Sequence, residues 1–276
     1  MAQMFIGTEA FAAGAVSKYD LRARYRRVLP NVYTAKRAHL SVHDRAVAAW
    51  LWSRREGVIS GVAASALHGA KWVDDDAVVE LNWPGRKSPP GLKVRNETLL
   101  DREIVCRRGV AVTSIARTAF DLARRGPSGS AIERLDALAC ASNFAVDDVL
   151  DIASKHPHVK GLSRVGGLLR QVDAGAQSPR ETWLRRLLIQ AGFPRPETQI
   201  PVPRLDGYSH YFLDMGWRDV MVAVEYDGEQ HRVDRNIYRD DLARSEYIAH
   251  VGWRRIRVIA GHRKTDIVRR VRQAWP

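Results

Sequence analysis

The chain has few cysteines: Cys106 and Cys140 are its only two, and they lie far apart with no CxxC pair. A disulfide framework and a zinc–thiolate centre are therefore excluded as organising features. No apolar run approaches the roughly 20 residues that a membrane-spanning helix needs. The N-terminal segment has no basic start and Glu9 interrupts its apolar run, so a signal peptide is not expected. These absences predict a cytoplasmic protein with no membrane partner.

What the chain has in excess is positive charge. Its 276 residues carry a formal net charge of +13, and 45% of them are hydrophobic, which is enough for buried cores. A strongly basic balance favours a polyanionic partner. Because no membrane segment is present, nucleic acid is the favoured partner. The alternative is a protein that is merely basic.

The pattern of expected helices and strands predicts a mixed α/β fold in three parts, residues 1–40, 41–174 and 175–276. In the first part, a helical stretch to Ala13 is followed by Gly14, and Ser17 is an N-cap candidate for a second helix that runs through Arg26. A short hairpin is expected over residues 28–33. Two helices around a glycine turn, followed by a hairpin, are typical of a winged helix-turn-helix.

The first part is also basic, with seven Lys or Arg residues against two acids. We expect five of them to contact DNA: Lys18, Arg22, Arg24, Arg26 and Arg27. The alternative is a helical hairpin whose charged face is simply solvated. Residues 41–174 form a mixed α/β segment in which no catalytic spacing is found, and its His68 is expected to be structural. A Gly/Ala-rich break at residues 173–177 marks the boundary of the third part.

The third part follows an αβββαβα order, which predicts a mixed sheet flanked by helices. Its expected elements are helices over 181–191, 237–250 and 264–275 and strands over 199–203, 210–217, 220–227 and 254–259.

An acidic constellation is the most informative feature of this part. Asp214 lies eleven residues before Glu225, and Asp227 and His231 follow. Unpaired carboxylates on a buried strand are costly, and a divalent cation resolves that cost. A tight turn at 218–219 would pair Asp214 with Ala223 and place Glu225 diagonally, roughly 7–8 Å away.

Two carboxylates at that spacing can share one Mg²⁺, which prefers oxygen ligands. Asp227 or His231 is then expected to help activate water. The alternative is that Asp214 is a turn residue and that Asp227 only begins a turn after a strand.

Three further residues belong to this expectation. Glu181 is the N3 acid of a capping box begun by Ser178, and it is a candidate for a second, catalytic role. Arg244 and Arg257 are candidates for clamping DNA phosphates near the acids. An ordinary solvated basic face is the alternative for these arginines.

The C-terminal hundred residues carry recognisable motifs: Leu213-Asp214-Met215, the segment VEYDGEQH at 224–231, Asp240-Asp241 with Arg244, and Gly252-Trp253 with Arg257. They resemble the Vsr-like branch of the PD-(D/E)XK nuclease superfamily. The resemblance implies a restriction-endonuclease-like fold and a DNA-cleaving site that depends on Mg²⁺ (or Mn²⁺), with Asp214 and Glu225 as metal ligands. Asp227 stands where many members carry a catalytic lysine, which leaves the base unassigned. The zinc ligands of very-short-patch repair endonucleases are absent, so mismatch repair is not implied.

The N-terminal half resembles AbiEi-type antitoxins of type IV toxin–antitoxin systems. The matching pieces include Tyr25-Arg26-Arg27-Val28, Ala66-Leu67-His68-Gly69 and Arg117-Thr118 with Asp121-Leu122-Ala123. The resemblance implies a DNA-binding winged helix-turn-helix and a possible toxin protein as partner. The sequence therefore predicts a Mg²⁺-dependent DNA endonuclease targeted by an N-terminal module. The alternative is an antitoxin-like regulator that binds DNA without cleaving it.

Overall fold

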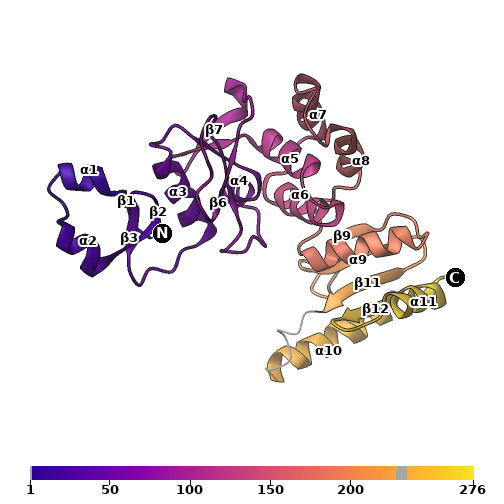
Figure 1. Cartoon of the computed structure of the whole chain (residues 1–276). Coiled ribbons are helices and arrows are strands. Elements are labelled where there is room, and N and C mark those ends of the chain that lie inside the picture. The colour runs from indigo at the N-terminus through magenta and orange to yellow at the C-terminus, as the bar shows by residue number, and fades with distance from the viewer. Residues whose placement is uncertain (1, 228–234) are drawn as a thin grey trace. The chain divides into compact units, whose positions relative to one another are not determined.

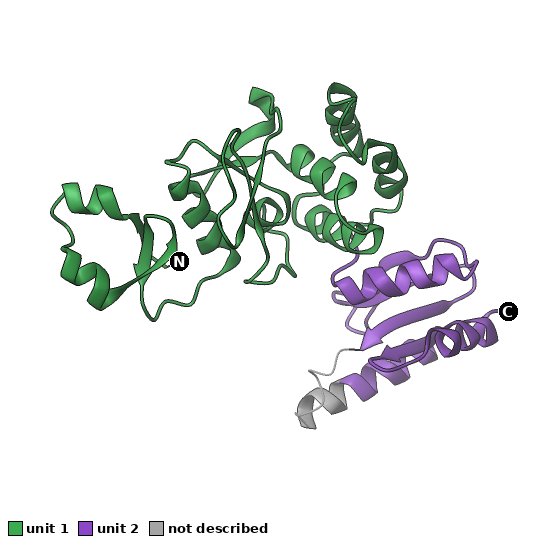
Figure 2. Cartoon of the chain, viewed as in Figure 1, with its two compact units in different colours: residues 1–174 green, residues 175–276 purple. Residues whose placement is uncertain are grey.

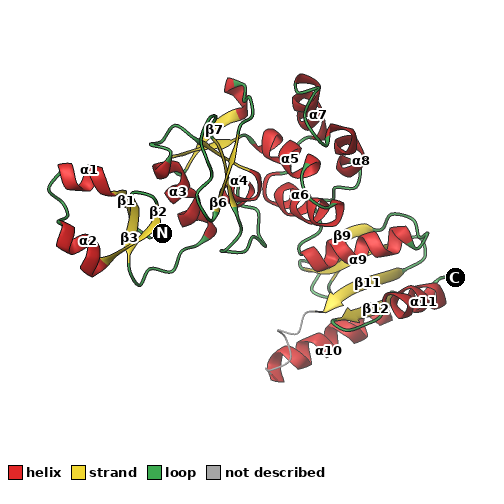
Figure 3. Cartoon of the chain, viewed as in Figure 1, coloured by secondary structure: helices red, strands yellow, loops and turns green. Residues whose placement is uncertain are grey.

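The computed structural model describes residues 2–227 and 235–276, with side chains described for residues 2–227 and 241–276. Helices take up 42% and strands 22% of the chain, and the strands form mixed sheets, so the protein belongs to the mixed α/β class (Figure 3). The chain divides into two compact units, Met1–Ala174 and Gly175–Pro276, which are described separately below (Figure 2).

Unit 1 begins with two short helices and a small antiparallel sheet. The elements in chain order are β1 (Met4–Ile6), α1 (Gly7–Ala12), α2 (Lys18–Arg24), β2 (Tyr25–Leu29) and β3 (Val32–Ala35) (Figure 1). The sheet has the order β1-β3-β2. Ser17 caps α2 in a reciprocal capping box with Asp20, as its sequence position predicts. The expectation that α2 continues to Arg26 is wrong, because Tyr25 turns extended and pairs with Ala35 of β3.

A five-stranded sheet forms the middle of unit 1, with the order β6-β5-β4-β8-β7. Its elements are α3 (Val42–Trp52), β4 (Val58–Ser60), α4 (Gly61–Leu67), β5 (Val79–Asn82), β6 (Leu92–Arg95), a 3-10 turn (Asp101–Glu103), β7 (Ile104–Arg107) and β8 (Val110–Thr113). Ile59, Leu81 and Val112 of the central strands are fully buried. They share one core with α3 and α4 and with Ile6 and Val32 of the N-terminal sheet, so these parts fold together.

Helices complete unit 1: α5 (Ile115–Arg124), α6 (Ser128–Ser142), α7 (Val146–Lys155), a 3-10 turn (Leu162–Arg164) and α8 (Val165–Leu169). They bury a second apolar core around Phe120, Ile132, Leu135 and Leu138. Asn143 ends α6 in the left-handed region, which asparagine adopts more easily than most residues.

Unit 2 is a four-stranded sheet with helices on both faces. In chain order it contains α9 (Pro179–Gln190), β9 (Glu197–Pro203), β10 (His210–Trp217), β11 (Val222–Asp227), α10 (Arg235–His250), β12 (Arg254–Ile259) and α11 (Lys264–Ala274). The strand order is β12-β11-β10-β9. β9, β10 and β11 are antiparallel neighbours, whereas β12 is parallel to β11 because α10 provides the crossover between them.

The two faces of this sheet are covered by different helices. Leu184 of α9 and Ile267 of α11 share a core with Val224, while Ile248 of α10 packs with Ala223. Because neighbouring residues of a strand point to opposite faces, α10 covers the face opposite to α9 and α11. On β10, Leu213 belongs to the α10 side and Met215 to the other side. The alternation is therefore interrupted at Asp214.

The pairing of β10 with β11 differs from the sequence expectation. Trp217 pairs with Val222 and Met215 with Val224, so the pairing of Asp214 with Ala223 predicted from a two-residue turn is wrong. The connection spans residues 218–221, and Met221 adopts a φ of +53°, which brings the chain back two residues later than a tight turn would. This register makes Asp214 and Glu225 the next facing positions beyond the last printed pair.

Candidate functional site

Asp214 and Glu225 face one another where the β10–β11 ladder ends. Residues directly opposite in an antiparallel pair have Cβ atoms roughly 4.5–5.5 Å apart, which is closer than the diagonal spacing expected from the sequence. The Asp214 side chain also continues the ladder, since its Oδ2 accepts a hydrogen bond from the Tyr226 backbone N–H at 2.8 Å. One carboxylate oxygen is therefore fixed against β11, and the other oxygen of Asp214 accepts no hydrogen bond from any described residue.

The electrostatic environment of Asp214 disfavours its charge. Burial raises the pKa of Asp214 from 3.8 to about 6, the nearby Glu181 carboxylate adds to that rise, and Asp227 contributes a smaller repulsion. The Tyr226 N–H and Arg244 act in the opposite direction without cancelling the rise. Within the described part of the chain, no ion pair involves Asp214.

Glu225 is more deeply buried than Asp214 and is held by two arginines. Its Oε1 accepts from Arg244 Nη2 at 2.6 Å, and its Oε2 accepts from Arg255 Nη1 at 3.0 Å. Burial nevertheless raises the pKa of Glu225, because Arg244 and Arg255 compensate the desolvation only in part. Both oxygens of this predicted metal ligand thus have a cationic partner.

Asp227 and Arg257 form a pair on the neighbouring strands β11 and β12. Arg257 donates from Nη2 to Asp227 at 2.6 Å and from Nη1 to Asp241 at 2.7 Å. The pKa of Arg257 is raised because the hydrogen bonds to these two carboxylates outweigh its partial burial. The expectation that Arg257 is available to clamp a phosphate is not met in this arrangement, since both of its terminal nitrogens bind acids.

Glu181 lies in the first turn of α9, where Ser178 is the N-cap and Pro179 opens the helix, as the sequence predicts. Its Oε1 accepts from the Ser178 hydroxyl at 2.8 Å and its Oε2 accepts from the Gln177 N–H at 2.9 Å. Burial raises the pKa of Glu181 despite these bonds. The residue therefore caps the helix and also places negative charge near Asp214.

The chemistry that these residues can support depends on two carboxylates. His231, the predicted proton-transfer residue, lies outside the described residues. Among the residues that are described, no three His, Cys, Asp or Glu side chains come together in a group able to hold a metal ion. Asp214 and Glu225 are a pair of oxygen donors, and Mg²⁺ is commonly held by one or two carboxylates together with water and substrate phosphate.

The basic residues predicted to contact DNA at the N-terminus are exposed. Lys18, Arg22 and Arg24 lie on α2, and Arg26 and Arg27 lie on β2. Arg26 donates to the Ala38 carbonyl at 2.9 Å, and Arg24 lies 3.7 Å from Asp20. Exposed ion pairs of this kind are weak, so these guanidinium groups remain accessible to a polyanion.

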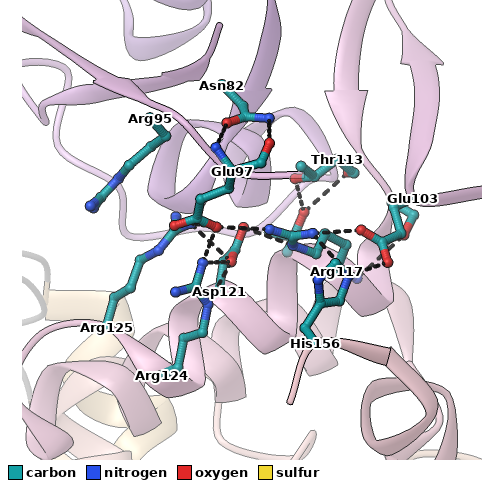
Figure 4. Close-up of polar contacts among 12 residues, drawn as sticks. Asn82, Arg95, Glu97, Glu103, Thr113, Arg117, Asp121, Arg124, Arg125 and His156 are labelled. Atoms are coloured by element: carbon teal, nitrogen blue, oxygen red, sulfur yellow. Dashed lines mark hydrogen bonds and ion pairs between the residues drawn. The ribbon is translucent and has the colours of Figure 1, made fainter. Parts of the chain in front are cut away.

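A second charged cluster, in unit 1, was not anticipated from the sequence. Arg117 is buried to 1% exposure on α5 and binds Glu103 at 2.5 Å, Glu97 at 2.9 Å and Asp121 at 3.3 Å (Figure 4). His156 bonds to the second oxygen of Glu103 at 2.7 Å. The cluster, which we name the Arg117 network, also includes Glu80, Arg95, Arg124 and Arg125. The i,i+4 spacing of Arg117 and Asp121 on an apolar helix is the one local signal that could have indicated it.

Comparisons with known proteins give relatives but no function. The chain is 26% identical over 191 residues to the uncharacterized proteins MT2308 and Rv2248 of Mycobacterium tuberculosis, which covers 69% of this chain and 69% of each relative. No protein-family model matches the chain. No solved structure matches it either. Across the described residues, no helix is both long enough and apolar enough to cross a membrane.

Proposed function

We propose that unit 2 is a nuclease domain that hydrolyses DNA phosphodiester bonds with the help of a divalent cation. The observation that carries the proposal is the state of Asp214. This carboxylate is largely buried, faces Glu225 across the strands, lies near Glu181 and has no ion-pair partner among the described residues. Carboxylates that are gathered without full compensation lower their mutual repulsion by sharing a cation.

Asp214 and Glu225 would hold the ion, and Mg²⁺ or Mn²⁺ prefers such oxygen donors. When bound, the ion would neutralise charge on the scissile phosphate and lower the pKa of a water molecule. Glu181 contributes by repulsion, because its charge raises the free energy of the ion-free Asp214 carboxylate. Asp227 is held by Arg257 close to the same strand end, where it can accept a hydrogen bond from water. The exposed basic residues of α2 and β2 in unit 1 would supply affinity for DNA.

The direct test is nicking of supercoiled plasmid in the presence of Mg²⁺ or Mn²⁺. Asp214→Asn should abolish nicking, because it removes a ligand charge from the proposed site. Asp266→Asn, the same chemical change on the surface of α11, should leave nicking at the wild-type rate. Nicking that survives Asp214→Asn would come from a contaminant or from another site, and either result contradicts the proposal.

One observation favours a second candidate, a DNA-binding regulator that does not cleave. Arg244 and Arg255 already occupy both oxygens of Glu225, so the pair is partly neutralised without an ion. If gripping DNA is the only function, DNA binding will persist in EDTA while nicking is absent with every cation.

The contribution of α2 to DNA binding is separable from either candidate. In gel shifts with EDTA, combined substitution of Lys18, Arg22 and Arg24 by Gln should reduce the salt-dependence slope by about 3, since each lost phosphate contact removes about 0.9. A triple substitution of the exposed Lys71, Lys87 and Lys160 by Gln removes the same charge elsewhere in unit 1. Equal slopes for the two triple variants would remove α2 from the account of DNA binding.

A further inference from the structure

The two arginines on Glu225 are held very differently. Arg255 has only 8% of its side chain exposed, and its other terminal nitrogen donates to the Ser245 hydroxyl, so it is fixed on both sides. Arg244 has 28% exposed, and a single nitrogen, Nη2, donates to both Glu225 Oε1 at 2.6 Å and the Phe212 carbonyl at 2.7 Å. Its remaining terminal nitrogen, Nη1, has no hydrogen bond among the described residues. Arg255 is therefore a structural counter-ion, and Arg244 is the exchangeable one.

This difference decides which oxygen of Glu225 a cation can reach. Oε2 is bound by the buried Arg255, whereas Oε1 is bound by the partly exposed Arg244. An ionised carboxylate has about four lone-pair positions, so it can keep one arginine and still ligate a metal. Release of Arg244 alone would thus be sufficient to open Oε1 toward Asp214.

We propose that Arg244 couples cation binding to DNA binding by exchanging Glu225 for a DNA phosphate. Without DNA, the guanidinium holds Oε1 and competes with the cation. With DNA in place, the guanidinium pairs with a phosphate, whose geometry matches its fork, and Oε1 becomes a ligand. This inference rests on the proposed cation site at Asp214 and Glu225, and it assigns Arg244 the role of a positioning residue for that site.

The exchange has a thermodynamic consequence. If DNA removes a competitor of the cation, DNA tightens cation binding, and the cation must tighten DNA binding by the same factor. The advantage of such coupling is that the cation is held strongly only when a phosphodiester is present. The Phe212 carbonyl keeps a hydrogen-bonding position for Arg244 at the edge of β10 in the absence of its carboxylate partner.

The test measures Mn²⁺ affinity of the full chain by electron paramagnetic resonance, with and without a short phosphorothioate duplex that resists cleavage. Arg244→Gln should bind Mn²⁺ about tenfold more tightly than wild type in the absence of DNA, which corresponds to about 1.4 kcal/mol. With the duplex present, the two proteins should agree to within about twofold, because the duplex has then displaced Arg244 in the wild type.

Arg180→Gln is the matched control. Arg180 is exposed on α9 and lies 5.9 Å from the ring of Tyr226, so it carries one positive charge near β11, and none of its described contacts is with Glu225. Its substitution should change Mn²⁺ affinity by less than about twofold, because only a screened charge is removed. Circular dichroism confirms that both variants are folded.

The possible failures are distinguishable. If Arg244→Gln and Arg180→Gln change Mn²⁺ affinity equally, the effect is general electrostatics and the exchange is refuted, while the cation site stands. If Arg244→Gln changes nothing in the absence of DNA, Arg244 does not compete with the cation and the exchange is also refuted. If neither the wild type nor Arg244→Gln binds Mn²⁺ with or without the duplex, the cation site itself is refuted and the exchange with it.

Discussion

Two regions of this protein bury carboxylates beside arginines, with opposite electrostatic results. In the Arg117 network of unit 1, burial raises the pKa of Glu97, but Arg125, Arg124 and Arg117 together reverse the effect and lower it. Glu80 behaves in the same way, through its hydrogen bond from Arg95 and its proximity to Arg125. In unit 2, the pKa values of Glu181, Asp214 and Glu225 are all raised.

The difference lies in how many cations each region provides for its acids. The Arg117 network sets four arginines against four carboxylates, and each of these acids has at least one arginine within 3.3 Å. In unit 2, Glu225 takes both nearby arginines, Arg257 serves Asp227, and Asp214 is left without an ion pair among the described residues. A fully compensated cluster stabilises a fold, whereas an under-compensated one is suited to bind a cation.

The largest expected effect would break the first half of this comparison. Arg117→Met should lower the free energy of unfolding by about 3–5 kcal/mol, because it leaves the buried carboxylates of Glu103 and Asp121 without their central counter-ion. Arg102→Met is the matched control, since Arg102 is half-exposed and pairs with Asp151 at 3.2 Å. That substitution should cost less than about 1 kcal/mol. Equal losses in urea unfolding for the two variants would show that the Arg117 network is not a compensated core.

The next effect tests the other half. The folded-state pKa of Asp214, about 6, lies above its ordinary value of 3.8, so the folded protein binds this proton more tightly than the unfolded one. Its contribution to stability therefore becomes less favourable as the pH rises from about 4 to about 6, and above that range the penalty is about 3 kcal/mol. Asp214→Asn should thus stabilise the protein by about 2–3 kcal/mol near pH 8 and should have little effect near pH 4.

Denaturant unfolding at the two pH values measures this difference. A stabilisation that is the same at both pH values would come from packing rather than from charge, and it would contradict the view that Asp214 is under-compensated.

The smallest effect sharpens the role of Glu181. Glu181→Gln removes the charge near Asp214 but keeps a side chain that can complete the cap of α9. It should lower the pKa of Asp214 below about 6 and change stability by less than about 1 kcal/mol. Ser178→Ala is the complementary variant, because it costs about 1 kcal/mol of capping and leaves the charge of Glu181 in place. A carbon-13 titration of the Asp214 carboxyl that is identical in wild type and Glu181→Gln would remove Glu181 from the site.

Local patterns predicted several elements of unit 2 closely. The strands expected over 210–217 and 254–259 are observed as His210–Trp217 and Arg254–Ile259, because apolar alternation and flanking turn residues mark both of their ends. The Ser178-Pro179 pair likewise marks the start of α9. In unit 1, the Ser17–Asp20 capping box marks the start of α2, but its end was predicted two residues too late, since pairing of Tyr25 with β3 overrides helix propensity.

The sequence by itself determined which residue types gather at the end of β10 and β11, and that they include more acids than a buried strand tolerates alone. Only the tertiary structure decided their partners. The four-residue connection with Met221 at positive φ set the register that places Asp214 opposite Glu225. The crossover through α10 brought Arg244, Arg255 and Arg257 onto the acids. Strand register and ion pairing depend on contacts between residues distant in sequence, and local patterns do not encode which of those contacts has the lowest free energy.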